Sequence, residues 1–512
     1  MKKTHLFFLI LTFLIFSFSN LSYGWQGRMG GMGDPYGLVQ DESDFLIHPA
    51  KIANGKGINF YGGYRFNYTD VTDWNYNLVQ FTPAGILTNF YNYNTSGDEY
   101  RHDGLLGAAF PLGPGRMGLF FEYAGKRGDY DGHEDVLGIS NFARHDLTSD
   151  LDNFALRLLY GIPMGGFKLG GEFQLAYRKE ENENWHQYTD LSQSHLNKLF
   201  GFNSPNREVM PFQLPYDSRY WEALFKGSLD GKVGPLDLEF TLRGGFIFGG
   251  DNSLLMERQI PVGTINARAD MGGDVTGWRI GGDLWLRYPL ANDIALPFLV
   301  RVDYQQKTRD GDGPGTLSWS PWNENYKSEE KNLRLTVGGG VDKKLNKGTK
   351  IAAGIYYNYL QWENNIKLAA LGLFNETFDS SDCPAAIEHQ VMLRLAGEHE
   401  FSPMVALRMG LNFFYGWVSE DFTFTYSNSL PFQYNDDISL NGSHWGIGAS
   451  IGGTVKFQRF TIEPFINGGW QKLNLKGDGE RNTIGVGINN LWEMDKLRKE
   501  WFIGGGFSIK FN

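Results

Sequence analysis

The chain is poor in the features that stabilise a large secreted soluble protein or a helical membrane protein. Its 512 residues contain a single cysteine, Cys383, which excludes an internal disulfide framework and a Cys-x-x-Cys-His haem-attachment motif. After residue 24, no run approaches the ~18 consecutive apolar residues that a membrane-spanning helix needs. The net charge of −11 argues against nucleic acid as a partner. Stability must therefore come from another architecture.

Residues 1–24 have the composition of a secretory signal peptide. Lys2 and Lys3 precede an apolar run over residues 6–18, and small residues precede the expected cleavage after Gly24. The apolar run is too short to span a bilayer as a helix. We therefore expect export by the secretory pathway and a mature chain that starts near residue 25.

Much of the remaining chain alternates between apolar and polar residues. In the stretch LDLEFTLRGGFIF, residues 236–248, Phe240 and Leu242 flank Thr241, and this period of two is typical of a strand with one apolar face. Sixteen such segments are each near the length that a tilted strand needs to cross a bilayer. They lie at about 57–69, 102–112, 116–126, 152–163, 167–179, 219–230, 236–248, 275–288, 296–306, 331–344, 350–362, 389–400, 405–417, 443–456, 460–473 and 499–511.

The connections between these segments alternate in length. Short connections at 113–115, 165–166, 231–235, 289–295, 346–349, 401–404 and 458–459 are separated by longer ones, such as 180–218 and 363–388. Short periplasmic turns and long extracellular loops are typical of barrels in the outer membrane of Gram-negative bacteria. We therefore predict an all-β fold, a transmembrane antiparallel β-barrel over residues 57–512 with about 16 strands, 14 being possible.

The polar face of the predicted strands carries charge near mid-strand, where a lipid-facing side chain would be costly. We therefore expect these side chains to point into the lumen. Both signs are present, which suits neither strong cation nor strong anion selection. The lumen-lining candidates are Arg65, Glu122, Arg157, Lys168, Glu172, Glu222, Lys226, Asp237, Glu239, Arg243, Arg279, Asp283, Arg287, Arg301, Asp303, Arg334, Arg394, Glu398 and Arg408.

The last strand carries a pattern similar to the sorting signal that barrel-assembly machinery reads. Its residues are Gly504, Gly506, Ile509 and Phe511. The expected partners are therefore this machinery, outer-membrane lipid and lipopolysaccharide, and a small-molecule substrate of unknown identity. Neither a metal site nor a cofactor is predicted, because the histidines of the predicted loops lack ligand spacing and two Asp-Gly stretches, 129–135 and 310–313, lack a completing acidic residue.

Residues 25–56 precede the first predicted strand and do not alternate. Their motifs resemble those of the FadL-like fatty-acid transporter superfamily, which includes PorV-type barrels: a Gly-Arg start, further glycines, an acidic pair, and then Pro-Ala before the first strand. The resemblance implies that this segment plugs the barrel, that hydrophobic substrates pass through it, and that the barrel has fourteen strands. The plug or gate candidates carried by these motifs are Gly27, Arg28, Gly33, Asp41, Glu42, His48, Pro49 and Ala50.

Three classes of function fit these patterns unequally. The first is an outer-membrane channel or transporter, either plugged and passing small hydrophobic or amphipathic molecules, or open as a general diffusion porin. The second is a scaffold or sheath for another exported protein. The third is a barrel enzyme, which would pair a nucleophile with a base near one rim. The candidates for such a pair are scattered residues such as His444, Ser443 and Ser450. We therefore predict a transport protein and no enzyme.

Overall fold

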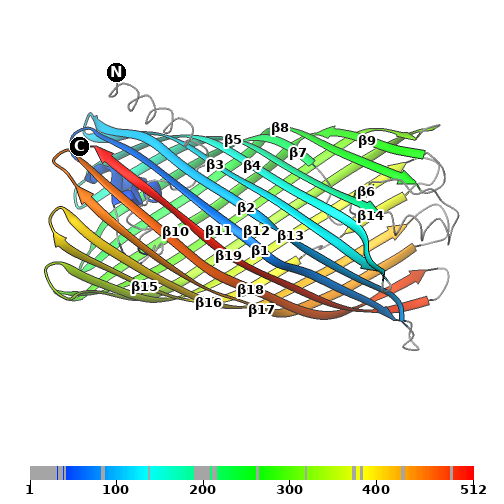
Figure 1. Ribbon diagram of the computed structural model, residues 1–512. Coiled ribbons are helices and arrows are strands. Elements are labelled where there is room, and N and C mark those ends of the chain that lie inside the picture. The colour runs from blue at the N-terminus through cyan, green and yellow to red at the C-terminus, as the bar shows by residue number, and fades with distance from the viewer. Residues whose placement is uncertain are drawn as a thin grey trace, which may run out of the picture.

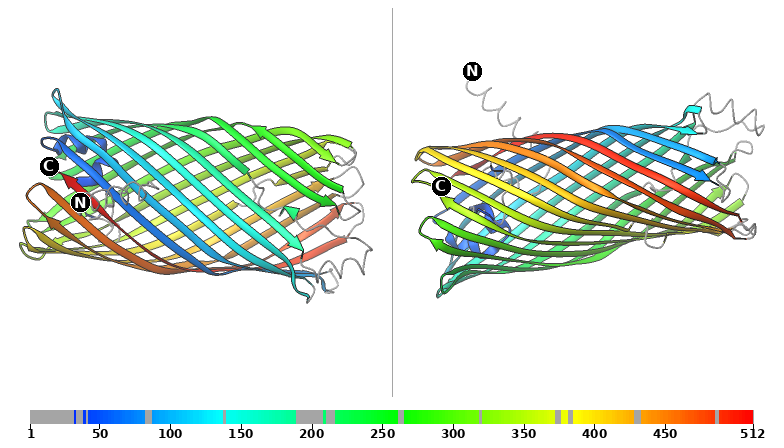
Figure 2. Two further views of the ribbon diagram at one scale, coloured as in Figure 1. Left: turned by 45° about the horizontal axis from the view of Figure 1, so that its top comes forward. Right: turned by 90° about the horizontal axis from the view of Figure 1, so that it is seen from below.

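The computed structural model is a closed antiparallel β-barrel with tilted strands (Figures 1 and 2). It describes residues 32, 38–39, 42–81, 87–136, 139–188, 208–209, 216–260, 265–317, 320–371, 376–380, 385–427, 433–484 and 488–511. Sixteen of the strands in this part of the chain form the wall. They are β1 (Asn59–Phe81), β2 (Leu87–Leu112), β3 (Gly115–Val136), β4 (Ile139–Met164), β5 (Phe167–Tyr188), β7 (Tyr216–Val233), β8 (Leu236–Ile260), β10 (Val275–Ala291), β11 (Ile294–Leu317), β12 (Ser320–Lys344), β13 (Thr349–Leu371), β15 (Ala385–Ser402), β16 (Val405–Ser427), β17 (Gln433–Lys456), β18 (Phe460–Ile484) and β19 (Ile488–Phe511).

The wall closes because the first and last strands pair along their whole lengths. Phe60 of β1 lies opposite Phe511 of β19, and the register continues to Phe81 opposite Leu491. Closure leaves no free strand edge in the hydrocarbon, where an unpaired amide would be costly. Each predicted segment falls in one wall strand, so sixteen is confirmed, and the fourteen implied by the family resemblance is wrong.

The strands are longer than the sequence pattern predicted. The expected loop over 180–218 starts inside β5, which continues to Tyr188, and it ends inside β7. The expected loop over 363–388 is likewise taken up by the ends of β13 and β15 and by the short β14 (Glu376–Ser380). The Asp-Gly stretches 129–135 and 310–313 lie in β3 and β11. Beyond the bilayer both faces meet water, so the apolar alternation disappears while backbone pairing continues.

Two further short strands extend the wall in the same region. β9 (Ile265–Gly273) pairs with β8 and β11, and β10 begins two residues after it, so these two strands form one nearly continuous element. The two-residue β6 (Glu208–Val209) pairs with β5. The barrel wall therefore rises well beyond its membrane-spanning part.

The short turns gather at the end of the barrel where the C-terminus lies (Figure 1). Gly113, Gly165 and Gly234 have φ between 56° and 64°, a left-handed conformation that glycine adopts without steric cost. These three positions let the strands reverse direction within two or three residues. The prediction of short connections is confirmed.

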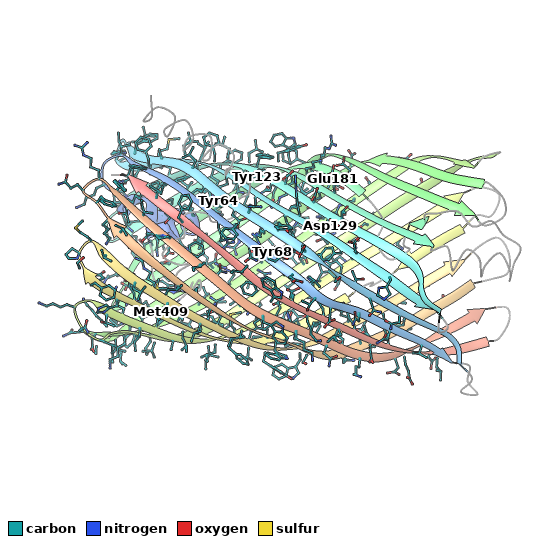
Figure 3. The ribbon with its side chains drawn as sticks, viewed as in Figure 1. Tyr64, Tyr68, Tyr123, Asp129, Glu181 and Met409 are labelled. Carbon is teal, nitrogen blue, oxygen red and sulfur yellow. The ribbon has the colours of Figure 1, made fainter. Side chains whose placement is uncertain are left out.

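The outward face identifies the part of the barrel that lies in lipid. Along β16 the alternate residues from Val405 to Trp417 point outward with exposed fractions of 36–54%, and Figure 3 labels Met409 of this row. Twelve residue steps of about 3.4 Å, tilted by about 40°, rise about 31 Å, close to the thickness of a bilayer core. Outward apolar residues also reach the turns, with Met164, Leu290 and Phe401 58–66% exposed. The hydrocarbon therefore covers the barrel up to its short turns, and the polar half projects beyond the membrane.

Two short 3₁₀ helices lie inside the barrel, near the end that carries the turns (Figures 1 and 2). They are η1 (Glu42–Leu46) and η2 (Pro49–Asn54). In the described residues, no helix has the length and apolar character needed to cross a membrane.

Candidate functional site: the lumen and its N-terminal segment

The N-terminal segment contacts opposite walls of the lumen. Met32 and Leu38 are buried against Trp285, Leu299 and Tyr356, which come from β10, β11 and β13. Phe45, Leu46 and Ile52 are buried in a second cluster, which they share with Tyr61, Leu105, Phe120 and Leu159 of β1 to β4. These two groups of strands face one another in the sixteen-strand ring. The described residues of the N-terminal segment therefore contact both sides of the barrel interior.

The wall residues that η2 approaches most closely are glycines, which have no side chain. A Cβ atom at Gly170 of β5 would lie 2.1 Å from the backbone nitrogen of Ala50, and one at Gly161 would lie 2.7 Å from Ile52. Both distances are shorter than real Cβ contacts, so only glycine lets the segment lie against the wall here. The Ala50 amide also donates a hydrogen bond of 2.6 Å to Ser228 Oγ on β7.

His48 and Lys51 anchor the segment to β8. Nδ1 of His48 shares a hydrogen bond of 2.6 Å with Thr241 Oγ1, and its Nε2 lies 3.4 Å from a carboxylate oxygen of Glu239. Lys51 forms ion pairs of 2.7 Å with Glu239 and 3.0 Å with Asp44. Because a carboxylate can only accept, we infer that the neutral ring carries its proton on Nε2, toward Glu239.

Burial sets the protonation of these two side chains. Burial, and then the positive charge of Lys51, lower the pKa of His48 from 6.5 to about 3. Burial by itself would also lower the pKa of Lys51. The carboxylates of Asp44 and Glu239 have the larger combined effect, so the pKa of Lys51 is raised overall. The segment is thus held by a neutral histidine beside a charged lysine.

We predict that acid weakens this anchor through His48. Below pH 6.5 the unfolded chain protonates His48 while the folded chain does not, so folding stability falls between pH 6.5 and about 3. From about pH 7.5 to about pH 4.5 the loss from this residue is about 2 to 3 kcal/mol. His48→Asn keeps a polar side chain that does not titrate. In urea titrations, the variant should therefore lose less stability than the wild type over this range; equal losses would contradict the assignment.

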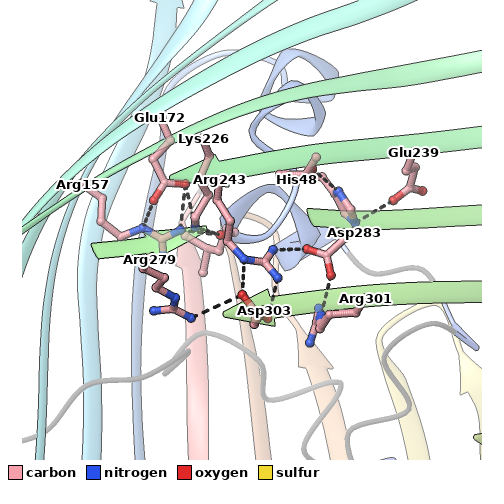
Figure 4. Close-up of polar contacts among 12 residues, drawn as sticks. His48, Arg157, Glu172, Lys226, Glu239, Arg243, Arg279, Asp283, Arg301 and Asp303 are labelled. Atoms are coloured by element: carbon pink, nitrogen blue, oxygen red, sulfur yellow. Dashed lines mark hydrogen bonds and ion pairs between the residues drawn. The ribbon is translucent and has the colours of Figure 1, made fainter. Parts of the chain in front are cut away.

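A buried charge cluster surrounds the end of η1 (Figure 4). Nε and Nη2 of Arg157 donate hydrogen bonds of 2.8 and 3.0 Å to the two carboxylate oxygens of Glu172, and Nη1 donates to Glu122. Lys226 forms an ion pair of 3.1 Å with the same Glu172. Arg157 and Lys226 both also donate to the backbone carbonyl of Leu46. The cluster therefore joins four wall strands, β3, β4, β5 and β7, to the N-terminal segment.

A second cluster crosses the lumen wall from β8 to β11 (Figure 4). Arg243 donates to Asp283 and, through two nitrogens at 2.6 Å, to both carboxylate oxygens of Asp303. Arg301 donates to Asp283 as well. Arg279 lies 3.7 Å from Asp303 and thus belongs to the same network. Its charges alternate in sign, so the network rigidifies the wall and gives it no strong net field.

The other lumen-lining candidates also lie on the inner face of the barrel. Their ion pairs are Arg65–Asp103, Lys168–Asp230, Arg178–Glu222, Lys232–Asp237, Arg287–Asp342 and Arg408 with both Glu398 and Glu463. Arg394 lies 5.0 Å from the ring of Tyr356, and Arg334 lines a cavity. Several of these ion-pair partners were not identified from the sequence. Asp103 and Glu463 could have been, because they occupy the alternate positions of their strands that face the lumen.

The predicted terminal motifs are only partly placed. Gly27, Arg28, Gly33 and Asp41 lie outside the described residues, as does the predicted signal peptide. Glu42 begins η1, and His48, Pro49 and Ala50 are buried inside the barrel. At the other end, Gly504 and Gly506 belong to the inner face of β19, whereas Phe511 is 49% exposed on the outer face.

The residues weighed for hydrolysis are not arranged as a catalytic pair. Ser443 and His444 are neighbours in β17 and therefore point to opposite faces of the sheet. His444 faces the lumen, where its Nδ1 lies 3.0 Å from Glu388. Ser450 is six residues further along the same strand, about 20 Å away.

A cavity of about 590 Å³ lies in the lumen against β10 to β18. Leu360, Trp362, Val418 and Leu473 contribute apolar surface to its lining. Its ionisable residues include Arg279, Asp303, Arg334, Glu388, Glu420 and His444, and Gln305, Asn332 and Gln361 add amides. The apolar members were not expected, because strand alternation assigned leucine and tryptophan to the lipid face. A mixed lining of this kind suits a molecule with both apolar and polar parts.

The closed wall, its apolar outer band and its polar, partly occupied interior define a transmembrane β-barrel of the outer-membrane type. No family model and no curated protein matches the sequence.

Solved structures similar to this chain include a monoaromatic hydrocarbon channel and a toluene transporter. The chain is 12% identical to a TodX monoaromatic hydrocarbon channel with a deltaS2S3 mutation, with a TM-score of 0.43 over 96% of this chain and 99% of that one. A FadL homologue of Pseudomonas aeruginosa is 11% identical, with a TM-score of 0.44 and coverage of 96% and 98%. The toluene transporter TbuX of Ralstonia pickettii is 12% identical, with a TM-score of 0.40 and coverage of 96% and 99%. At such distances the functional argument depends on the chain's own residues.

Proposed function

We propose that the protein is an outer-membrane channel that passes small hydrophobic or amphipathic molecules through a lumen closed at its periplasmic end by the N-terminal segment. The observation that carries the proposal is the buried contact of this segment with opposite walls, through Met32 and Leu38 on one side and Phe45 and Ile52 on the other. A segment held in this way narrows the passage without disrupting the barrel wall.

The cavity against β10 to β18 supports the proposed substrate class. Trp362 and Leu360 offer apolar surface, while Arg334 and Glu388 offer polar groups within the same lining. A strictly polar solute would leave the apolar part unused, and a strictly apolar one would leave charged groups desolvated. The substrate proposed for this cavity is therefore amphipathic.

Two other functions are less well supported. A general diffusion porin needs a continuous water-filled lumen, and the buried segment and its charge clusters occupy part of this one. A sheath for another exported protein needs the same space for its partner. Both alternatives require the segment between Met32 and Ile52 to leave the lumen.

We predict that deletion of residues 27–56 opens the channel. A sixteen-strand barrel is wide enough for an aqueous pore once its interior is cleared. Single-channel conductance in planar bilayers should therefore rise by roughly tenfold or more relative to the intact protein.

The matched control for this deletion is Arg127→Ala, because Arg127 is 77% exposed on the outer face and far from the segment. Its conductance should equal that of the wild type. High conductance in the intact protein would instead indicate an open porin, and equal, negligible currents before and after deletion would refute the gate.

A further inference from the structure

The lipid-facing wall has an apolar groove near its periplasmic edge. The groove has a volume of about 360 Å³ and crosses β12, β13, β15 and β16. Its outward-facing lining consists of Val341, Lys343, Ile351, Ala353, Leu395, Gly397, Met409 and Leu411. Volumes of a few hundred Å³ are typical of sites for small ligands.

Strand register creates the groove by placing small residues among large ones. Ala353 of β13 lies between Val341 of β12 and Leu395 of β15. Gly397 of β15 lies between Ile351 and Met409. The wall is therefore indented at two adjacent positions, with branched or long side chains at its borders.

Open space remains at the centre of the groove. A Cβ atom built on Gly397 would have its nearest neighbour at 3.9 Å, the backbone oxygen of Lys350, which is an ordinary van der Waals distance. At Gly340 of β12, by contrast, a Cβ atom would lie 2.1 Å from the backbone oxygen of Ala353 on the neighbouring strand. Gly397 thus keeps a volume free that a side chain could fill without displacing the backbone.

Positive charge lies at the periplasmic end of this groove. Lys343 lines the groove itself, Lys344 ends β12, and Lys347 lies in the turn that follows; Lys344 and Lys347 are exposed. Residues 343–350 contain no acidic residue, although the chain as a whole carries a net charge of −11. Of the neighbouring acidic residues, Asp342 and Glu398 pair with Arg287 and Arg408 of the inner face, whereas Asp293 and Glu400 are exposed near the turn.

We propose that this groove binds one anionic phospholipid of the inner leaflet, with an acyl chain along Ala353 and Gly397 and the headgroup phosphate beside Lys343 and Lys347. The apolar band reaches the short turns, so the groove lies at the depth of the acyl chains and the lysines lie at the depth of the phosphates. The inner leaflet faces these turns, which is why a phospholipid, and not lipopolysaccharide, is the ligand. Charge complementarity then selects an anionic headgroup over a zwitterionic one.

The test measures association of spin-labelled phosphatidylglycerol and phosphatidylcholine with the full-length protein in vesicles. The wild type should immobilise phosphatidylglycerol several-fold more strongly than phosphatidylcholine. The double variant Lys343→Gln/Lys347→Gln should lose this preference. Gly397→Leu should reduce the immobilised fraction of both lipids, because its side chain fills the groove.

A matched control is Lys232→Gln, because Lys232 is a 73% exposed lysine at another short turn. This variant should keep the wild-type preference. If Gly397→Leu fails to assemble, Ala353→Leu fills the neighbouring position of the same groove. Equal immobilisation of the two lipids by the wild type would overturn the proposal. A change of oligomeric state in Gly397→Leu, with unaltered lipid association, would also overturn it and assign the groove to a second copy of the chain.

Discussion

Replacement of Arg157 by alanine should lower the free energy of unfolding by about 3 to 5 kcal/mol. The Arg157 side chain is 2% exposed and neutralises two carboxylates, Glu122 and Glu172, while also donating to the Leu46 carbonyl. Its removal leaves buried negative charge, for which Lys226 is the remaining ion-pair partner among the described residues. Breaking one side of a buried pair in this way costs more than the pair itself contributes, because the remaining charge stays desolvated.

The measurement is urea unfolding of the protein in detergent micelles or vesicles. Arg127→Ala is the control, because its ion pair with Asp150 is 3.8 Å long and exposed, and it should change stability by less than about 0.5 kcal/mol. Arg157→Lys should recover only part of the loss, since one ammonium group cannot bridge two carboxylates and a carbonyl as a guanidinium does. If Arg157→Ala matched the control, the cluster would not hold the segment.

The barrel wall could be predicted from the sequence because it depends on a local rule. Alternation along residues 405–417 reports which side chains meet lipid, and the structure places this row outward as expected. The charged row of β8, with Glu239 and Arg243, could likewise be assigned to the inside. Neighbouring antiparallel strands then follow from short turns, as at Gly165.

The parts of the strands that project beyond the membrane could not be predicted in the same way. Asp129 of β3 and Glu181 of β5 lie in parts of the strands whose outer face is exposed to water (Figure 3). The sequence in these parts is therefore as polar as that of a loop. Backbone hydrogen bonds hold these strands together, and such bonds do not require apolar and polar side chains to alternate along the sequence.

The interior of the barrel depends on contacts that are distant in sequence. His48 meets Thr241 across 193 residues, and Arg157 meets the Leu46 carbonyl across 111. A motif resemblance indicated that residues around His48 matter, but no periodicity could identify their partners. The lumen cavity was missed for a different reason: Trp362 breaks the rule that apolar residues face lipid, as functional sites often break local rules.

A carboxylate placed on the lipid face should destabilise the protein far more than one placed a single residue away. Leu411 is 50% exposed on the outer face of β16, near the middle of its apolar row, whereas Asn412 faces the lumen. Leu411→Asp should therefore lower the free energy of unfolding in vesicles by roughly 2 to 3 kcal/mol, since hydrocarbon cannot solvate the charge. Asn412→Asp changes the side chain isosterically and lies opposite Arg394 on the neighbouring strand, so its effect should stay below about 0.5 kcal/mol.

This comparison of adjacent positions tests most directly whether lipid covers the outside of the wall and polar groups line its inside. The measurement is the urea unfolding free energy of both variants in the same phospholipid vesicles, with the wild type as reference. A large loss for Leu411→Asp and almost none for Asn412→Asp is the expected result. Equal losses, or a larger loss for Asn412→Asp, would contradict the orientation of every strand in the barrel.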